Sequence, residues 1–103
     1  MNTKMVTQQP TRVIFRTYGH TVIALFPEEP TDTYGYMVSS YAHVGKHSAA
    51  DYYGVMQDTR AATPTEYASL KAELEAFGYI LDIVKRASSK MHNRRNELVW
   101  ENR

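Results

Sequence analysis

The sequence predicts an α+β domain, in which an antiparallel sheet of four to five strands in β-β-β-β-α-β order carries one helix on a face, followed by a short C-terminal helix. Three observations lead to this fold class. Two runs rich in β-branched and aromatic residues flank Gly19-His20, a helix start signal stands at residues 63–66, and another β-rich run directly follows Gly78. A helix placed between strands in this way packs across the sheet that they form.

The first two predicted strands form a hairpin. Residues 12–18 and 21–26 are β-branched and aromatic runs, and Gly19-His20 between them suits a two-residue type II′ turn. Residues 27–33 contain two prolines, which lack an N–H and fix φ. We therefore expect this segment to leave the sheet as an exposed acidic loop.

The middle of the chain is predicted to add two more strands. Residues 36–44 alternate with period two, which indicates a third strand whose second face is the more polar. Residues 45–51 are small and polar, which is typical of a loop or a single helical turn. Residues 52–59 then read as a fourth strand.

The clearest local signal is the helix start at Thr63-Pro64-Thr65-Glu66. It offers an N-cap threonine, a proline at the first helical position and a glutamate three residues after the cap. Apolar residues recur at 67, 70, 74 and 77, and Gly78 suits a left-handed C-cap. These signals predict a helix over about 64–77, and the β-branched run at 79–85 predicts a fifth strand after it.

The C-terminal segment is polar apart from a few apolar residues close to its end. This composition predicts a second, weaker helix or a tail that orders on contact. Because a tryptophan near a chain end rarely stays in water, we expect Leu98, Val99 and Trp100 to dock on the sheet or on another subunit, so that Leu98 and Trp100 could form a homodimer. The predicted organisation is a polar leader (1–11), a single α+β domain (12–86) and a basic C-terminal helix or tail (87–103).

Composition narrows the function classes. The 103 residues are 43% apolar and 22% charged, the balance of an ordinary globular domain. A formal net charge of +1 argues against a protein that acts chiefly as a polycation or an acidic nucleic-acid mimic. The absence of cysteine excludes disulfides, thiolate zinc sites and a cysteine nucleophile. No stretch has the apolar length of a signal peptide or a membrane span, so we expect a cytoplasmic protein with no membrane partner.

Residues 39–53 hold the densest group of side chains able to bind or titrate near neutrality. On a continuous helix the spacing of His43, His47 and Asp51 would place two imidazoles and a carboxylate on one face, as a metal site requires. The strand pattern before Gly45 opposes such a helix, so histidines that satisfy backbone carbonyls at a strand end are the favoured interpretation. We expect no metal and no cofactor.

A small hydrolase or phosphodiesterase is one alternative. Its acid and base would be His43 and His47, with Lys46 or Arg60 on the phosphate. These residue types suit many reactions, and no nucleophile or metal motif accompanies them. The sequence therefore favours a binding protein over an enzyme, without assigning catalytic residues.

Tyrosines point to a contact surface instead. Eight in 103 residues exceed what one small core buries with every hydroxyl satisfied, and exposed tyrosine gives rigid contact area at low entropic cost. The predicted contact surface is the tyrosine and histidine loop: Tyr41, His43, Lys46, His47, Asp51, Tyr52 and Tyr53.

A single-stranded nucleic-acid binder is the other alternative. The basic C-terminal segment could lie along a phosphate backbone with tyrosines stacking on bases. Its predicted contacts are Arg86, Lys90, Arg94 and Arg95. No known nucleic-acid-binding motif accompanies them.

Five segments resemble a family of short uncharacterised proteins encoded by bacteriophages and other mobile elements. The likeness spans roughly residues 12–86, and the segments lie at 13–16, 22–27, 40–47, 50–52 and 62–67, the third reading Ser-Tyr-Ala-His-Val-Gly-Lys-His. The resemblance brings no activity with it. It implies a protein that works in the host cytoplasm by contact with a host protein or complex, such as an anti-CRISPR-like inhibitor of host defence.

Overall fold

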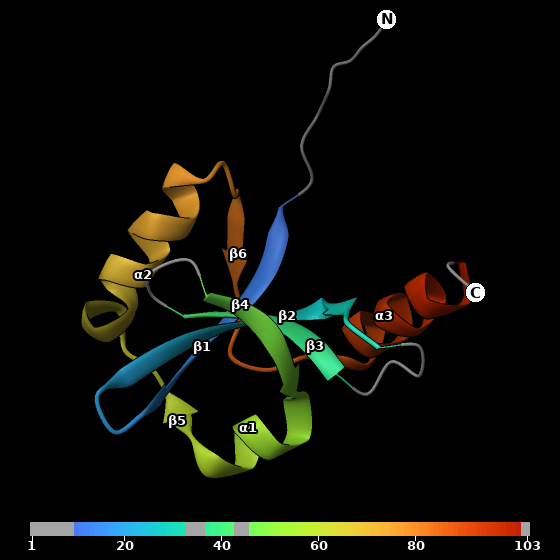
Figure 1. The fold of residues 1–103 in the computed structure, drawn as a ribbon, viewed down its shortest axis with the longest axis horizontal. Coiled ribbons are helices and arrows are strands. Elements are labelled where there is room, and N and C mark those ends of the chain that lie inside the picture. Colours follow the sequence, from blue (N-terminus) through green and yellow to red (C-terminus); the bar gives the residue numbers. More distant parts are fainter. Residues whose placement is uncertain (1–9, 33–36, 43–45, 102–103) are drawn as a thin grey trace, which may run out of the picture.

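A six-stranded sheet forms the centre of the molecule in the computed structural model, which describes residues 10–32, 37–42 and 46–101 (Figure 1). The α+β class and the mostly antiparallel sheet are confirmed. The main path of the sheet runs β4-β3-β2-β1-β5, and β6 pairs with β1. The strands are β1 Thr11–Tyr18, β2 Thr21–Pro30, β3 Met37–Ala42, β4 Lys46–Asp51, β5 Arg60–Ala61 and β6 Leu81–Ile83, and the helices are α1 Tyr52–Asp58, α2 Pro64–Ala76 and α3 Ser89–Glu101.

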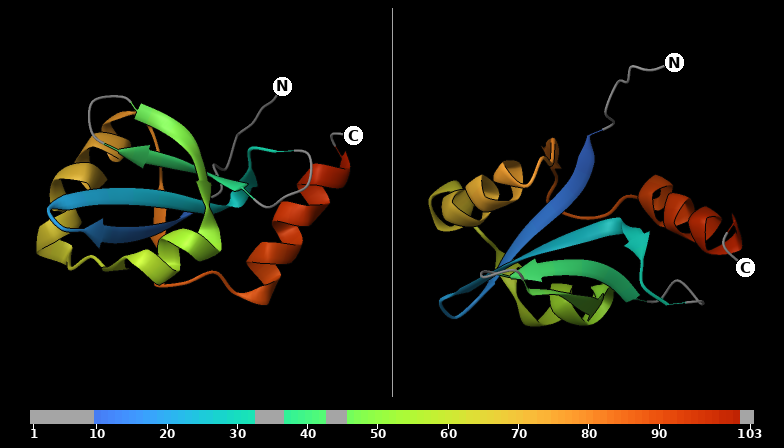
Figure 2. Two further views of the ribbon diagram at one scale, coloured as in Figure 1. Left: turned by 60° about the horizontal axis from the view of Figure 1, so that its bottom comes forward. Right: turned by 45° about the horizontal axis from the view of Figure 1, so that its top comes forward.

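Helices cover both faces of the sheet, with α2 on one side and α1 on the other (Figure 2). Beneath α2 lies one apolar cluster: Val13, Phe15, Ala24, Phe26, Tyr41, Leu70 and Leu74. The opposite cluster is Ile14, Leu25, Val38 and Tyr52, with Val55, Met56, Val84 and Ala87 packed against it. Alternate residues of β1 and β2 thus fill two cores, because successive strand side chains point to opposite faces.

The predicted hairpin is confirmed. Tyr18 pairs with Thr21, so Gly19-His20 forms a two-residue turn, and Gly19 has φ 59°, a conformation that glycine adopts without strain. The loop expected at 27–33 is wrong for its first part, because β2 continues to Pro30. The ladder between β2 and β3 jumps from Phe26↔Ser39 to Pro30↔Val38. This bulge accommodates Pro27, since bulged residues need no ladder hydrogen bond, whereas Pro30 stands opposite Val38 where the register resumes.

Two predictions in the middle of the chain are wrong. Residues 46–51, expected as a loop or helical turn, form β4 and pair with β3 along its whole length. Residues 52–59, expected as a strand, form α1. Tyr52, Val55 and Met56 face the second core at helical spacing, so packing overrides their β propensity. A small, polar edge strand carries little β signal in its sequence.

The predicted strands at 36–44 and 79–85 exist in shorter form as β3 and β6. Contrary to the expected antiparallel arrangement, β6 is parallel to β1. Because β5 is antiparallel to β1, the chain reverses its direction between β5 and β6, by way of α2 and the turn at Gly78, and so comes to lie parallel to β1.

The helix predicted at about 64–77 is confirmed as α2. The Glu66 N–H donates to Thr63 Oγ1 at 3.3 Å, and the Thr63 N–H donates to Glu66 Oε1 at 2.9 Å, which completes the capping box. Leu70 and Leu74 are buried, and Gly78 follows the helix with φ 104°.

The bulge in β2 also positions α3. Arg95 of α3 is only 4% exposed, and its Nη1 donates to the Pro27 carbonyl at 2.6 Å. Pro27 lies in the β2–β3 bulge and beyond Ile14↔Leu25, the last pair between β1 and β2, so the guanidinium supplies a hydrogen bond to a carbonyl that neither neighbouring strand pairs. The predicted C-terminal helix is therefore confirmed and packs on the rest of the fold. Of the residues expected to dock, Val99 is buried, whereas Trp100 is 72% exposed and does not dock on this sheet; docking on another subunit stays a prediction.

Arg16 holds α1 against β1. Its Nε donates to Thr59 Oγ1 at 2.9 Å, and its Nη2 donates to the carbonyls of Met56 and Thr59. These bonds satisfy carbonyls at the end of α1, which have no partner within the helix. The orientation of α1 on the second core depends on this clamp.

Replacement of Arg95 by methionine should lower the free energy of unfolding by about 2 kcal/mol, because it leaves the Pro27 carbonyl without its charged donor. Chemical denaturation measures the change. Arg94→Met is the control, since Arg94 is half-exposed, and it should change the same quantity by no more than about 0.5 kcal/mol. Equal effects of the two substitutions would contradict the role of Arg95.

Hydrogen bonds from Arg60 and the Thr63 N–H lower the pKa of Glu66 from 4.5 to about 2. The ionised carboxylate therefore contributes stability that is present above pH 4.5 and is lost as the pH falls from about 4.5 towards 2. At neutral pH the melting temperature of Glu66→Gln should be lower than that of the wild type, and the two melting temperatures should converge as the pH falls towards 2. Thermal unfolding measures both. Glu75→Gln, which changes a carboxylate on the same helix, is the control.

Candidate functional site

β4 is an edge strand and contains most of the predicted contact surface. Within the part of the chain that the structure describes, it pairs with β3 alone. One side of Lys46–Asp51 thus pairs with no described strand, and we call this side the β4 edge. An unpaired strand edge presents N–H and C=O groups to which another strand can add.

The strand pairings determine which amides face outward. The Ala62 N–H donates to the Phe15 carbonyl, so the polar groups of Phe15 point away from β2. Its antiparallel partner Ala24 then points towards β3, and Tyr41 points back towards β2. His47, paired with Tyr41, therefore turns its N–H and C=O to the free edge.

The same alternation assigns the next residues of β4. Ala49 lies two positions after His47, so its N–H also faces the free edge. Ser48 faces β3, as shown by Ser40 Oγ, which donates to the Ser48 carbonyl at 3.0 Å. The side chains of Ser48 and Ala49 are small and exposed, which leaves the edge open to close approach.

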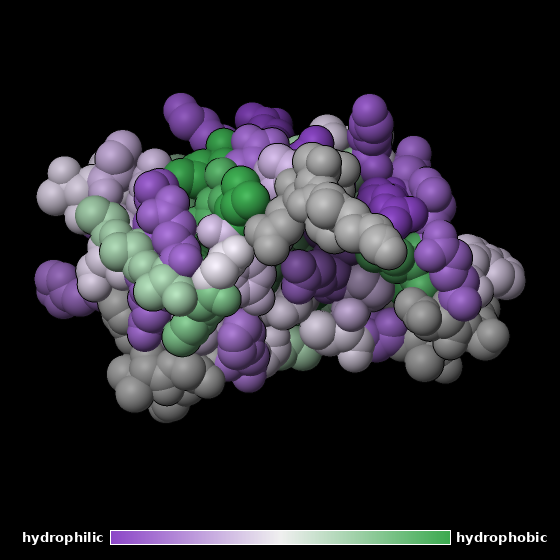
Figure 3. Space-filling view, turned by 90° about the horizontal axis from the view of Figure 1, so that it is seen from above, coloured by the Kyte–Doolittle hydropathy of each residue, from purple (hydrophilic) through white to green (hydrophobic). Residues whose placement is uncertain are grey.

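Aromatic and apolar side chains lie at the His47 end of the edge. The buried ring of Tyr41 contacts His47 at 4.6 Å between centroids and Phe77 at 5.8 Å. Phe77 is 58% exposed, and Ile80 after it is 49% exposed. Figure 3 shows hydrophobic side chains gathered over the end of α2 and the start of β6. An apolar surface therefore continues from this end of the β4 edge.

Glu29 is the titratable group next to this end. Burial raises the pKa of Glu29, the charge of His47 lowers it and Glu28 raises it further. Tyr79 stacks on Phe26 at 5.5 Å, and burial followed by the charge of Glu29 raises the pKa of Tyr79. Glu29 is thus a carboxylate held in a partly apolar surrounding beside the candidate edge.

Tyr52 and Tyr53 lie at the other end, where β4 meets α1. Asp51 is the N-cap residue of α1 but makes no side-chain cap. Tyr52 is 5% exposed, and its hydroxyl accepts a hydrogen bond from the Ala87 N–H at 2.8 Å. Tyr53 is 64% exposed and stacks on His92 of α3 at 5.7 Å. Only the second tyrosine offers its ring to a partner.

His92 is held in one tautomer. Arg95 Nη2 lies 2.8 Å from His92 Nδ1, and because arginine can only donate, Nδ1 accepts and the neutral ring carries its proton on Nε2. Burial, followed by the charge of Arg95, lowers the pKa of His92. The imidazole below Tyr53 is therefore an uncharged stacking platform.

The structure divides the predicted contact residues into exposed and buried groups. His47, Asp51 and Tyr53 are exposed along the β4 edge and its end. Tyr41 and Tyr52 are buried core residues, so neither presents its ring to a partner. His43 and the side chain of Lys46 lie outside the described residues, although the Lys46 backbone belongs to β4.

The described residues proposed for the hydrolase alternative do not come together in one site. His47 and Asp51 are four residue steps apart along an extended strand, about 13 Å, so they do not share a metal ion. The residues that the structure describes contain no group of three metal-ligating side chains. Arg60 lies on β5, at the sheet edge opposite β4, and its guanidinium is paired with Glu66 at 2.9 and 2.6 Å.

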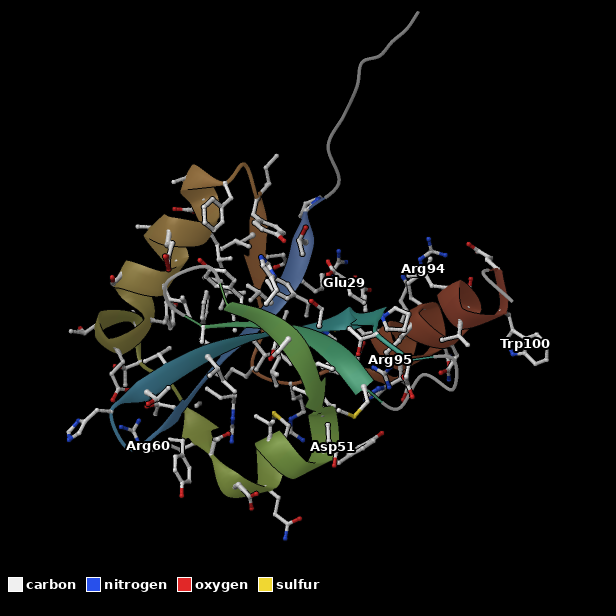
Figure 4. All side chains as sticks on the ribbon, in the orientation of Figure 1. Glu29, Asp51, Arg60, Arg94, Arg95 and Trp100 are labelled. Carbon is white, nitrogen blue, oxygen red and sulfur yellow. The ribbon has the colours of Figure 1, made fainter. Side chains whose placement is uncertain are left out.

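The basic residues proposed for nucleic acid do not form one surface. Arg95 is buried, whereas Arg94 lies on the outer side of α3, 3.6 Å from carboxylates of both Glu97 and Glu101 (Figure 4). Arg86 and Lys90 are exposed. The four cations predicted to bind a phosphate backbone thus include one that solvent barely reaches.

Sequence reasoning missed Phe77 and His92 as neighbours of the edge. The spacing of residues 67, 70, 74 and 77 predicts Phe77 on the core face of its helix, and His92 belongs to no motif. The available signals were the position of Phe77 immediately before Gly78, where the helix ends, and the i, i+3 spacing of His92 and Arg95.

Comparison of the chain with protein families, with curated proteins and with solved structures finds no match. None of the helices within residues 10–32, 37–42 and 46–101 combines the length and apolarity needed to cross a membrane.

Replacement of Glu29 by glutamine should change how stability depends on pH. A raised folded-state pKa means that the wild type loses unfolding free energy as the pH rises from 4.5, the ordinary pKa, through the higher folded value. As the pH rises from 4 to 7, the melting temperature of Glu29→Gln should therefore increase relative to that of the wild type. Thermal unfolding measures this difference. Glu97→Gln, an exposed control on α3, should follow the wild type, and a constant difference for Glu29→Gln would contradict the assignment.

Proposed function

We propose that this chain is a small non-enzymatic binding protein that captures an extended segment of a partner protein on the β4 edge. The free edge of β4, with the outward amides of His47 and Ala49, carries the proposal. Backbone pairing would supply affinity, and side chains at both ends would select the partner. The resemblance to short phage and mobile-element proteins makes a bacterial host protein the proposed partner and inhibition of host defence the proposed setting.

The ends of the edge support this function. Phe77 and Ile80 give an exposed apolar surface beside His47, and Tyr53 gives an exposed ring held in place by His92. Aromatic side chains that are fixed before binding lose little entropy on contact, which makes them effective interface anchors. A strand laid along β4 would reach both groups.

Capture from a bacterial lysate treated with nuclease, followed by mass spectrometry and titration of the purified partner, tests the proposal. Ala49→Pro removes the outward N–H and leaves the ladder to β3 intact, since proline is tolerated on edge strands where its nitrogen faces outward. It should weaken partner binding by about tenfold or more. Ala49→Val keeps the N–H and is the matched control, with an expected change of no more than about threefold.

Circular dichroism and thermal unfolding establish that both Ala49 variants are folded. Equal affinity of Ala49→Pro and the wild type would overturn strand addition at β4. Recovery of nucleic acid alone, lost on nuclease treatment, would favour the basic segment of α3 instead. Tyr53→Ala should also weaken partner binding, whereas Tyr18→Ala, which changes an exposed tyrosine at the far hairpin, should not.

A further inference from the structure

The side of the sheet opposite β4 is irregular, because two short strands share the outer side of β1. On this side of β1, β6 pairs in parallel with Thr11–Val13 and β5 pairs antiparallel with Arg16–Thr17 (Figure 1). The last hydrogen bonds before the junction run from the Val84 N–H to the Val13 carbonyl and from the Ala62 N–H to the Phe15 carbonyl. The two short strands therefore leave a gap in the sheet at Phe15.

One backbone donor in this gap has no strand partner among the described residues. The N–H of a strand residue points to the same side as its carbonyl, so the Phe15 N–H faces the gap. No described backbone hydrogen bond joins it to the Ala62 or the Val84 carbonyl, the two acceptors that would continue the ladders. Phe15 is only 3% exposed, and a donor at so buried a position is normally satisfied.

A pocket of about 310 Å³ opens at the same place, between the start of α2 and β6. Among the described residues, the side chains that line it are apolar apart from the Lys85 amine and the Tyr67 hydroxyl: Phe15, Ala61, Ala62, Pro64, Tyr67, Ile83, Val84 and Lys85. The rings of Phe15 and Tyr67 stack at 4.4 Å and form an aromatic wall. A volume of this order suits a small organic ligand.

We propose that this pocket binds a small apolar carboxylate, with its hydrocarbon or aromatic body against Phe15 and Tyr67 and its carboxylate at Lys85 and the Phe15 N–H. The chemistry of the lining selects this class. Apolar walls favour a hydrocarbon body, and the lone amine and the unpaired amide both require an acceptor. Among the described residues that line the pocket, Lys85 is the only charged one, so an anionic ligand meets no opposing carboxylate from them.

The proposal is independent of strand addition at β4, because the two sites lie on opposite edges of the sheet. The protein would then bind a small molecule at this pocket and its proposed partner at the β4 edge. Either proposal can fail without the other.

Titration of the full chain with 2-naphthoate, followed by amide NMR shifts and calorimetry, tests the site. The shifts should concentrate at Phe15, Ala62 and Val84. Lys85→Gln should weaken binding about fivefold, whereas Lys90→Gln, which removes an exposed amine on α3, should leave the affinity unchanged. The uncharged analogue 2-naphthylmethanol should bind at least about fivefold more weakly than 2-naphthoate.

Ala62→Leu fills the pocket and should abolish binding, with thermal unfolding used to establish that the variant is folded. Should Ala62→Leu not fold, Ile83→Trp at the exposed rim replaces it as the blocking variant. Absence of binding up to about 5 mM 2-naphthoate would overturn the proposal. Equal affinity of the wild type, Lys85→Gln and the blocking variant would overturn it as well.

Discussion

The hydrogen bond from the buried guanidinium of Arg95 to the Pro27 carbonyl is the interaction on which the arrangement of this fold depends most. Residue 27 lies in the β2 bulge and beyond the last pair between β1 and β2, and α3 supplies a charged donor to its carbonyl, which neither strand pairs. Because this bond places α3, it also places His92 against Tyr52 and Tyr53. Burial lowers the pKa of Arg95, and the neighbouring tyrosines and Asp32 oppose that shift.

The two cores have different consequences for the surface. The core beneath α2 is covered by this long, well-capped helix. Tyr41, which belongs to that core, contacts the rings of both His47 and Phe77. The opposite core is covered by the short helix α1, which Arg16 and Tyr52 attach to the sheet and to the Ala87 amide. The β4 edge runs between these two cores. Each of its ends contacts packed side chains, Tyr41 at one end and Tyr52 at the other, whereas the strand between them carries small side chains.

The sequence predicts those parts of the fold that local chemistry determines. The capping box at Thr63 and the Gly19-His20 turn are complete within a few residues, so they could be read without knowledge of the rest. β4 and α1 could not, because pairing with β3 decides the first and core contacts of Tyr52 decide the second. The same reason separates the site residues. The many histidines, tyrosines and charged residues around His47 indicate a contact surface. Which of these tyrosines face the core depends on whether each lies in a strand or a helix. The burial of Arg95 depends on its contact with a bulge 68 positions away in the sequence.

Amide hydrogen exchange of the isolated protein, measured residue by residue by NMR, tests the central claim most directly. The register assigns the amides of Ser48 and Ala50 to the β3 ladder and those of His47 and Ala49 to the free edge. Alternating protection, slow at 48 and 50 and fast at 47 and 49, is the expected result. Slow exchange at all four positions would show that the β4 edge is already covered, and the reverse alternation would show that the outward amides have been assigned wrongly.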